Sequence, residues 1–191
     1  MTLIMNRAVV TGTGAPSMTL ERKLDAYDRE RRALLDEMGA LDPIHLAFRH
    51  FAGEWTILEI LEHLALAERA VLRNLPEPSR MEAREPRLRQ RFAYTVVTFF
   101  LSFRVPVRVP SPEMVPRGDR PLNEVRRLWD ENARWLRAYV TRGEGLGRAV
   151  FLHPVAGPMT ASQAIRAGQL HLAVHRRQIW RILERPPVWE P

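Results

Sequence analysis

The chain has 191 residues, 46% of them hydrophobic, which is enough for one domain with a buried core and excludes a chain disordered throughout. It contains no cysteine, which excludes disulfide bonds, thiolate metal ligands and a cysteine nucleophile. The formal net charge of +7 is carried by arginine, because Lys23 is the only lysine, and this argues against a lysine-based Schiff base or phosphate loop.

Residues 1–17 contain the glycines of TGTGAPS, but no helix with the spacing of a phosphate-binding loop follows, so we predict a disordered leader. They also lack the basic start and the long apolar run of a signal peptide. The longest apolar-rich run, residues 93–103, is much shorter than the ~20 residues that cross a bilayer. We therefore expect a cytoplasmic protein without a membrane partner, with one domain over residues 18–185 and a C-terminal tail over residues 186–191.

Two amphipathic helices are predicted in the first half of the chain. Residues 17–38 carry apolar side chains at helical spacing, and Thr19 is expected to cap this helix. Residues 53–75 show the clearest amphipathic pattern, with Glu59 three positions after Thr56 in the arrangement of a capping box. Each helix has one apolar face that must pack against another element.

The middle of the chain mixes helix, strand and loop signals. The composition of residues 87–104 favours a strand and their length favours a helix, so the pattern leaves both open. The arginine block at residues 80–91 also carries Glu82 and Glu85, so we interpret it as a solvated helix start and expect no nucleic-acid partner. The proline-rich residues 105–121 then form a long extended connection.

Two further helices are predicted in the second half of the chain. Residues 122–140 repeat apolar side chains at helical spacing, and residues 160–183 begin with a second capping box formed by Thr160 and Gln163. Four amphipathic helices with a long proline-rich loop in the middle predict an all-α four-helix bundle with a long crossover connection.

Histidines on two of these helices suggest a metal site. His171 and His175 stand four residues apart, on one side of the last helix, which lets both imidazoles bind one ion at ~2.0–2.1 Å. Small residues on this face, such as Gly168, leave room for a bulky group. Packing without a metal explains such a pair as well, so a third ligand is needed. His63 lies at the edge of the apolar stripe of residues 53–75, where an unpaired imidazole costs free energy, and a shared ion would satisfy all three rings.

The other histidines stand in predicted turns and connections. We expect surface or capping roles for His45 and His50, whereas His153 could form a hydrogen bond near the site. The order of residues in EILEHL and HLAVH differs from the HExxH motif, in which a general-base glutamate lies between two zinc ligands. A peptidase of that class is therefore not expected.

Three stretches together resemble the DinB-like superfamily, whose members include stress-induced bacterial proteins and thiol-dependent transferases; they are WTILEILEHL (residues 55–64), HPVAGPMT (residues 153–160) and HLAVHRRQI (residues 171–179). The resemblance runs from about residue 20 to residue 183. It implies a DinB/YfiT-like bundle with one crossover, in which residues 87–104 form an extra helical segment. It also implies a divalent metal ion held by His63, His171 and His175, and often a homodimer.

Three neutral imidazoles leave coordination positions open, as in catalytic zinc sites, and they suit zinc, nickel and iron alike. Such an ion can activate a water molecule or a thiol, so we predict a metal-dependent enzyme, either a thiol transferase or a hydrolase. The resemblance favours transfer from a low-molecular-weight thiol to a small-molecule substrate. Glu59 is a candidate proton acceptor one turn before His63, although the capping box explains it as well. The alternative is a non-catalytic, metal-binding stress-response bundle.

Aromatic residues on the last two predicted helices suggest how a homodimer would form. We expect Trp129, Trp135 and Trp180 to be exposed and available for packing between subunits. Packing within a monomer explains the same residues.

Overall fold

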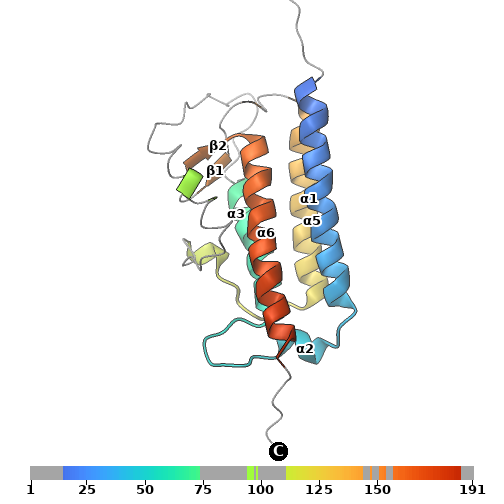
Figure 1. The fold of residues 1–191 in the computed structure, drawn as a ribbon, viewed down its shortest axis with the longest axis vertical. Helices are drawn as coiled ribbons and strands as arrows, with labels where there is room; N and C mark the ends of the chain where they lie inside the picture. Colours follow the sequence, from blue (N-terminus) through green and yellow to red (C-terminus); the bar gives the residue numbers. More distant parts are fainter. Residues whose placement is uncertain are drawn as a thin grey trace, which may run out of the picture.

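The computed structural model describes residues 15–73, 94–96, 98, 111–143, 147, 151–153 and 157–185. Among these residues four long helices form the body of the molecule (Figure 1): α1 Ala15–Gly39, α3 Ile57–Arg73, α5 Leu122–Arg142 and α6 Ala161–Leu183. The smaller elements are α2 Pro43–Ala47, the 3₁₀ turn η2 Pro112–Met114, and an antiparallel hairpin of β1 Phe151–His153 and β2 Gly157–Met159. Within this part of the chain, no helix has the length and apolar character needed to cross a membrane.

The four long helices pack as a bundle in which α1 and α3 each contact both α5 and α6. Three ion pairs show that α1 and α5 are antiparallel: Asp36–Arg126, Arg31–Asp130 and Asp25–Arg137. Contacts from Lys23 to Ser162 and from Glu37 to Arg176 show that α1 and α6 run in the same direction. Trp55, just before α3, packs on His175, and His63 contacts His171, so α3 is antiparallel to α6 and runs in the same direction as α5. The chain must therefore cross the length of the bundle between α3 and α5. The predicted all-α four-helix bundle with a crossover connection is confirmed.

The starts of α3 and α6 follow the predicted capping boxes. The backbone N–H of Thr56 donates to the carboxylate of Glu59 over 2.7 Å, and the N–H of Glu59 donates to the hydroxyl of Thr56 over 3.1 Å. Thr160 and Gln163 form the same reciprocal pair at the start of α6. Both helices that carry the candidate ligands therefore begin at residues fixed by local hydrogen bonds.

Several boundaries differ from prediction or lie outside the described residues. The first helix begins at Ala15, so Thr19 lies inside α1 and does not cap it. Residues 1–14 of the predicted leader lie outside the described residues. Proline at position 16 fits the first helical turn, where a backbone N–H has no partner within the helix. In the expected helical segment 87–104, residues 94–96 and 98 are helical; its other residues, the arginine block and the predicted tail lie outside the described residues.

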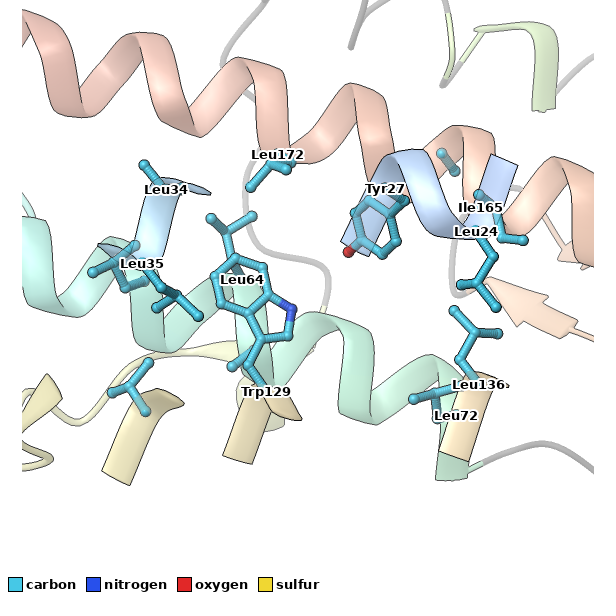
Figure 2. Packing of buried hydrophobic residues seen from close by; sticks show 14 of the residues in the cluster. Leu24, Tyr27, Leu34, Leu35, Leu64, Leu72, Trp129, Leu136, Ile165 and Leu172 are labelled. Carbon is cyan, nitrogen blue, oxygen red and sulfur yellow. The ribbon is translucent and has the colours of Figure 1, made fainter. Parts of the chain in front are cut away.

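The centre of the bundle is built from leucines of all four helices around one indole (Figure 2). Trp129 is 0% exposed, so our expectation that it is available to a partner is wrong. Its position four residues after the buried Val125 places it on the inner stripe of α5. Trp135 and Trp180 are exposed, as expected.

Candidate metal centre

The structure brings His63, His171 and His175 together where α3 packs against α6. The Nε2 atom of His171 lies 3.3 Å from Nε2 of His63 and 3.1 Å from Nε2 of His175. One ligand nitrogen from each residue lies within 4.8 Å of the others. In the described part of the chain, they form the one group of three or more His, Asp or Glu residues whose ligand atoms lie this close together. The predicted triad is thus assembled from two helices that are distant in the sequence.

In two of these rings, the hydrogen bond made by the outer nitrogen, Nδ1, determines whether the inner nitrogen, Nε2, presents a proton or a lone pair to the other histidines. Nδ1 of His63 lies 2.7 Å from the carbonyl oxygen of Met114. Since a carbonyl only accepts hydrogen bonds, Nδ1 carries the proton and Nε2 presents a lone pair. Nδ1 of His175 lies 2.9 Å from Oε1 of Gln178, an acceptor that selects the same tautomer. Two lone pairs therefore face Nε2 of His171, and a single N–H on that nitrogen can satisfy only one of them.

The donor set and its spacing fit a divalent cation. Tetrahedral coordination with bonds of ~2.0–2.1 Å separates two ligand nitrogens by roughly 3.3 Å. The measured separations of 3.3 and 3.1 Å are close to that value. Three neutral imidazoles suit zinc, nickel and iron, and the hydrogen bonds on the outer nitrogens are those that orient metal-binding histidines. A cation between the three rings would accept the lone pairs of His63 and His175 together, whereas one proton on Nε2 of His171 can pair with only one of them.

Burial keeps the three imidazoles neutral. Desolvation lowers the pKa of His63 below its ordinary value, partly opposed by the hydrogen bond to Met114. Desolvation, followed by the charges of the neighbouring histidines, lowers the pKa of His171 well below its ordinary value. The pKa of His175 falls to about 4 through burial and the charge of His63. Because neutral imidazole is the form that binds metal, these ligands need to release no proton at neutral pH.

Trp55 forms one wall of the centre, a role that the sequence pattern did not predict. The centroid of its ring lies 4.8 Å from that of His63 and 6.4 Å from that of His175, and it is nearly parallel to the latter at 24°. The residue is partly buried just before the start of α3. Trp55 belongs to the stretch of residues 55–64 that carries the family resemblance, and that resemblance was the one feature of the sequence that pointed to this residue. Contact with two rings restricts the motion of both.

The structure separates the remaining histidines. The charge of His153 is one of the causes that lower the pKa of His171, so this residue of β1 lies within electrostatic range of the centre. Burial lowers the pKa of His153 itself. His45 is exposed on α2, and the ring of His50 packs edge-on against Phe48 at 4.8 Å. Neither belongs to the triad.

Both carboxylate oxygens of Glu59 are engaged in contacts at the start of α3. Oε2 accepts from the backbone of Thr56, and Oε1 accepts from Arg49 over 2.7 Å. Burial raises the pKa of this carboxyl, but the hydrogen bonds from Thr56 and Arg49 outweigh burial and lower it. Glu59 would have to release one of these contacts to accept a proton, so its catalytic role stays a prediction.

Comparisons with known proteins agree with this architecture. Residues 26–179 match the family model described as the DinB superfamily. A comparison with curated proteins found no match. Among solved structures, the crystal structure of TT2238, a four-helix bundle protein, is similar with a TM-score of 0.50 and 22% identity, over 86% of this chain and 98% of that chain. At this identity the likeness shows the fold alone.

Proposed function

The chain belongs to the DinB superfamily, and on this premise we propose that it is a metal-dependent enzyme whose divalent ion is held by His63, His171 and His175. The observation that carries the proposal is the convergence of three Nε2 atoms, two of which present lone pairs to the third. Neutral imidazoles with facing lone pairs, one ring buried and two half-buried, cost free energy unless a cation occupies the space between them.

The ion would supply a Lewis acid that activates a thiol or a water molecule for attack on an electrophile. With three protein ligands, at least one coordination position stays open for a substrate. The hydrogen bonds to Met114 and Gln178 hold two ligand rings in place, and Trp55 packs against the same two rings. We place transfer of a low-molecular-weight thiol to a small electrophile first, because of the resemblance to thiol-dependent transferases, and hydrolysis second.

One observation also supports a non-catalytic role. The ligands come from α3 and α6, and His63 is only 4% exposed, so an ion would tie two helices together inside the bundle. An ion that binds the folded state and not the unfolded chain stabilises the fold by mass action. In this second candidate function, the protein is a metal-stabilised bundle without turnover.

Elemental analysis of the natively purified, untagged protein tests the site, and an assay with the metal found then tests the activity. We expect one divalent ion per chain and metal-dependent transfer from a small thiol. The His45→Ala variant should keep the ion, and the variant with alanine at His63, His171 and His175 should lose it. Stoichiometric metal in the triple variant would place the site elsewhere. A holo protein that turns over neither thiol and electrophile pairs nor esters, but melts on chelation, would favour the non-catalytic function.

A further inference from the structure

Glu62 is a buried carboxylate beside a candidate ligand, and the proposed metal centre does not by itself account for it. The residue is 1% exposed on α3, where a carboxylate costs free energy unless its oxygens are paired. Its Oε2 accepts hydrogen bonds from the backbone N–H groups of Arg117 and Gly118, over 3.1 and 3.0 Å. Its Oε1 lies 3.3 Å from the guanidinium of Arg120. All three partners belong to residues 117–120, at the end of the crossover connection.

The same stretch of chain supplies the carbonyl that orients His63. Met114 is 6% exposed at the end of η2, which packs on α3, and its carbonyl oxygen accepts from Nδ1 of His63. Only two residues separate Met114 from Arg117, whose N–H binds the carboxylate of Glu62. A displacement of the loop at Glu62 would therefore be transmitted to the carbonyl at His63.

The backbone at Gly118 shows how closely this loop approaches α3. Its φ of +75° lies in the left-handed region, which residues other than glycine rarely adopt. A Cβ at this position would lie 2.9 Å from Oε1 of Glu59, too close for the contact to persist. Glycine at position 118 therefore lets the loop bring its N–H to Glu62 without strain at φ and without displacing Glu59.

We propose that Glu62 is a positioning residue for the metal centre. By holding residues 117–120 against α3, it keeps the carbonyl of Met114 at Nδ1 of His63, and so keeps the Nε2 lone pair facing the other two histidines. A neutral imidazole can carry its proton on either nitrogen, and a proton on Nε2 blocks metal binding at that atom. The benefit to metal binding rests on the proposed function. The direct claim is that the tautomer of His63 depends on Glu62.

The test measures this tautomer in the metal-free protein and zinc affinity separately. Long-range ¹H–¹⁵N correlation spectra of the ¹⁵N-labelled chain distinguish a proton on Nδ1 from one on Nε2. In the wild type we expect His63 to carry its proton on Nδ1. In Glu62→Leu, which fills similar volume but accepts no hydrogen bond, we expect a mixture of tautomers and zinc affinity about ten- to hundredfold lower. Glu62→Gln, whose amide oxygen can still accept from the loop, should restore most of both.

Glu131→Leu is the matched control, because it removes an exposed carboxylate from α5 and should change neither readout. If Glu62→Leu does not fold, Glu62→Asp replaces it, since a side chain shorter by one methylene group cannot hold the loop in the same place. A folded variant, Leu or Asp, that keeps the Nδ1–H tautomer and wild-type zinc affinity would overturn the proposal. If the tautomer shifts but the wild type binds no zinc, Glu62 positions His63 as proposed and the metal-dependent function is the idea that fails.

Discussion

Two histidines of the centre differ in how a substitution could disturb their orientation, because their Nδ1 protons go to different kinds of acceptor. The Nδ1 proton of His63 goes to a backbone carbonyl, so no side-chain substitution at Met114 removes that acceptor. The corresponding acceptor for His175 is a side chain, Gln178, on the same helix. The orientation of His63 therefore depends on the path of the crossover connection, whereas that of His175 depends on one replaceable residue.

Acid should destabilise the metal-free protein through the buried histidines. Burial lowers the pKa of His175 to about 4, whereas the unfolded residue titrates at ~6.5. A depressed folded pKa gives stability that is fully present above the unfolded value and is lost as pH falls through the folded value. Between about pH 7 and about pH 4.5, we expect His175 to account for about 2 kcal/mol of that loss. Urea unfolding at about pH 7 and about pH 4.5 measures it.

Variants separate this effect from the titration of carboxylates over the same range. His45→Gln, which changes an exposed histidine, should lose as much stability with acid as the wild type. His175→Gln should lose clearly less. The same acid dependence in His175→Gln and in the wild type would contradict the assignment.

Glu68 is a half-buried residue of α3 whose carboxyl lies against buried side chains. Its Oε2 accepts hydrogen bonds from the hydroxyl of Tyr27 and from the indole of Trp129, while Oε1 is buried with no partner among the described residues. Burial raises the pKa of Glu68, and it also raises the pKa of Tyr27 well above its ordinary value. The neutral form of the carboxyl is therefore favoured by the fold.

Glu68→Gln should stabilise the protein at neutral pH. A raised folded pKa means that stability is lost as pH rises from the unfolded value of ~4.3 through the folded value. The amide stays neutral and can still accept from Tyr27, so we expect a gain in the free energy of unfolding at pH 7. The gain should shrink near pH 4, where the wild-type carboxyl is protonated. Denaturant titrations at both pH values test this, and a gain that does not change with pH would contradict it.

The candidate ligands could be predicted from the sequence because their signals are local. The pair His171 and His175 shows in the spacing along one helix, and His63 shows in its place on an apolar stripe. The roles of Met114 and Glu62 could not be predicted, because they depend on contacts between segments 51 or more residues apart that no spacing encodes. That the triad binds a metal ion stays a prediction.

At the scale of the elements, periodicity and capping boxes predicted the four long helices. The hairpin was missed because strands of three residues, Phe151–His153 and Gly157–Met159, are too short for alternation to be read. Trp129 was wrongly predicted to be exposed, because the many arginines of residues 122–140 do not show which face of the helix is buried. The space expected beside Gly168 is real, but the ring of Tyr27 from α1 fills it.

That contact gives a prediction for the packing of α1 on α6. In Gly168→Ala, the new methyl group would lie 3.2 Å from the ring of Tyr27, which is buried and hydrogen-bonded to Glu68 and so has little room to move. Crowding of this kind costs typically 1–3 kcal/mol, against a gain of up to ~1 kcal/mol from helix propensity. We expect a net loss of stability in thermal or urea unfolding. Gly147→Ala, whose methyl group would meet nothing within 4 Å, is the control, and a stabilised Gly168→Ala would contradict the prediction.

At the scale of the whole molecule, the exposed indoles bear on the proposed homodimer. Trp135 is 50% exposed on α5, but the guanidinium of Arg69 already lies 5.0 Å from the centroid of its ring. Trp180 is 42% exposed on α6, and no cation packs on its ring among the described residues. Trp180 is therefore the better anchor for a second copy of the chain.

Light scattering at micromolar concentration should give twice the chain mass of 22.1 kDa. We expect Trp180→Ala to raise the dissociation constant at least tenfold and Trp135→Ala to change it less, since truncation of a central aromatic residue typically costs 2 kcal/mol or more. A particle of 22.1 kDa for the wild type would contradict the dimer.

The separation of the ligands along the chain has a consequence for folding kinetics. His63 meets Met114 across 51 residues and His171 across 108, so the centre exists only after contacts of high sequence separation have formed. Such contacts form late, because the entropy of closing long loops must be overcome first. The centre should then be incomplete in the transition state, and zinc should slow unfolding while leaving the refolding rate nearly unchanged. Stopped-flow measurements with and without zinc test this, and refolding accelerated by the ion would mean that it recruits α3 and α6 before the bundle is built.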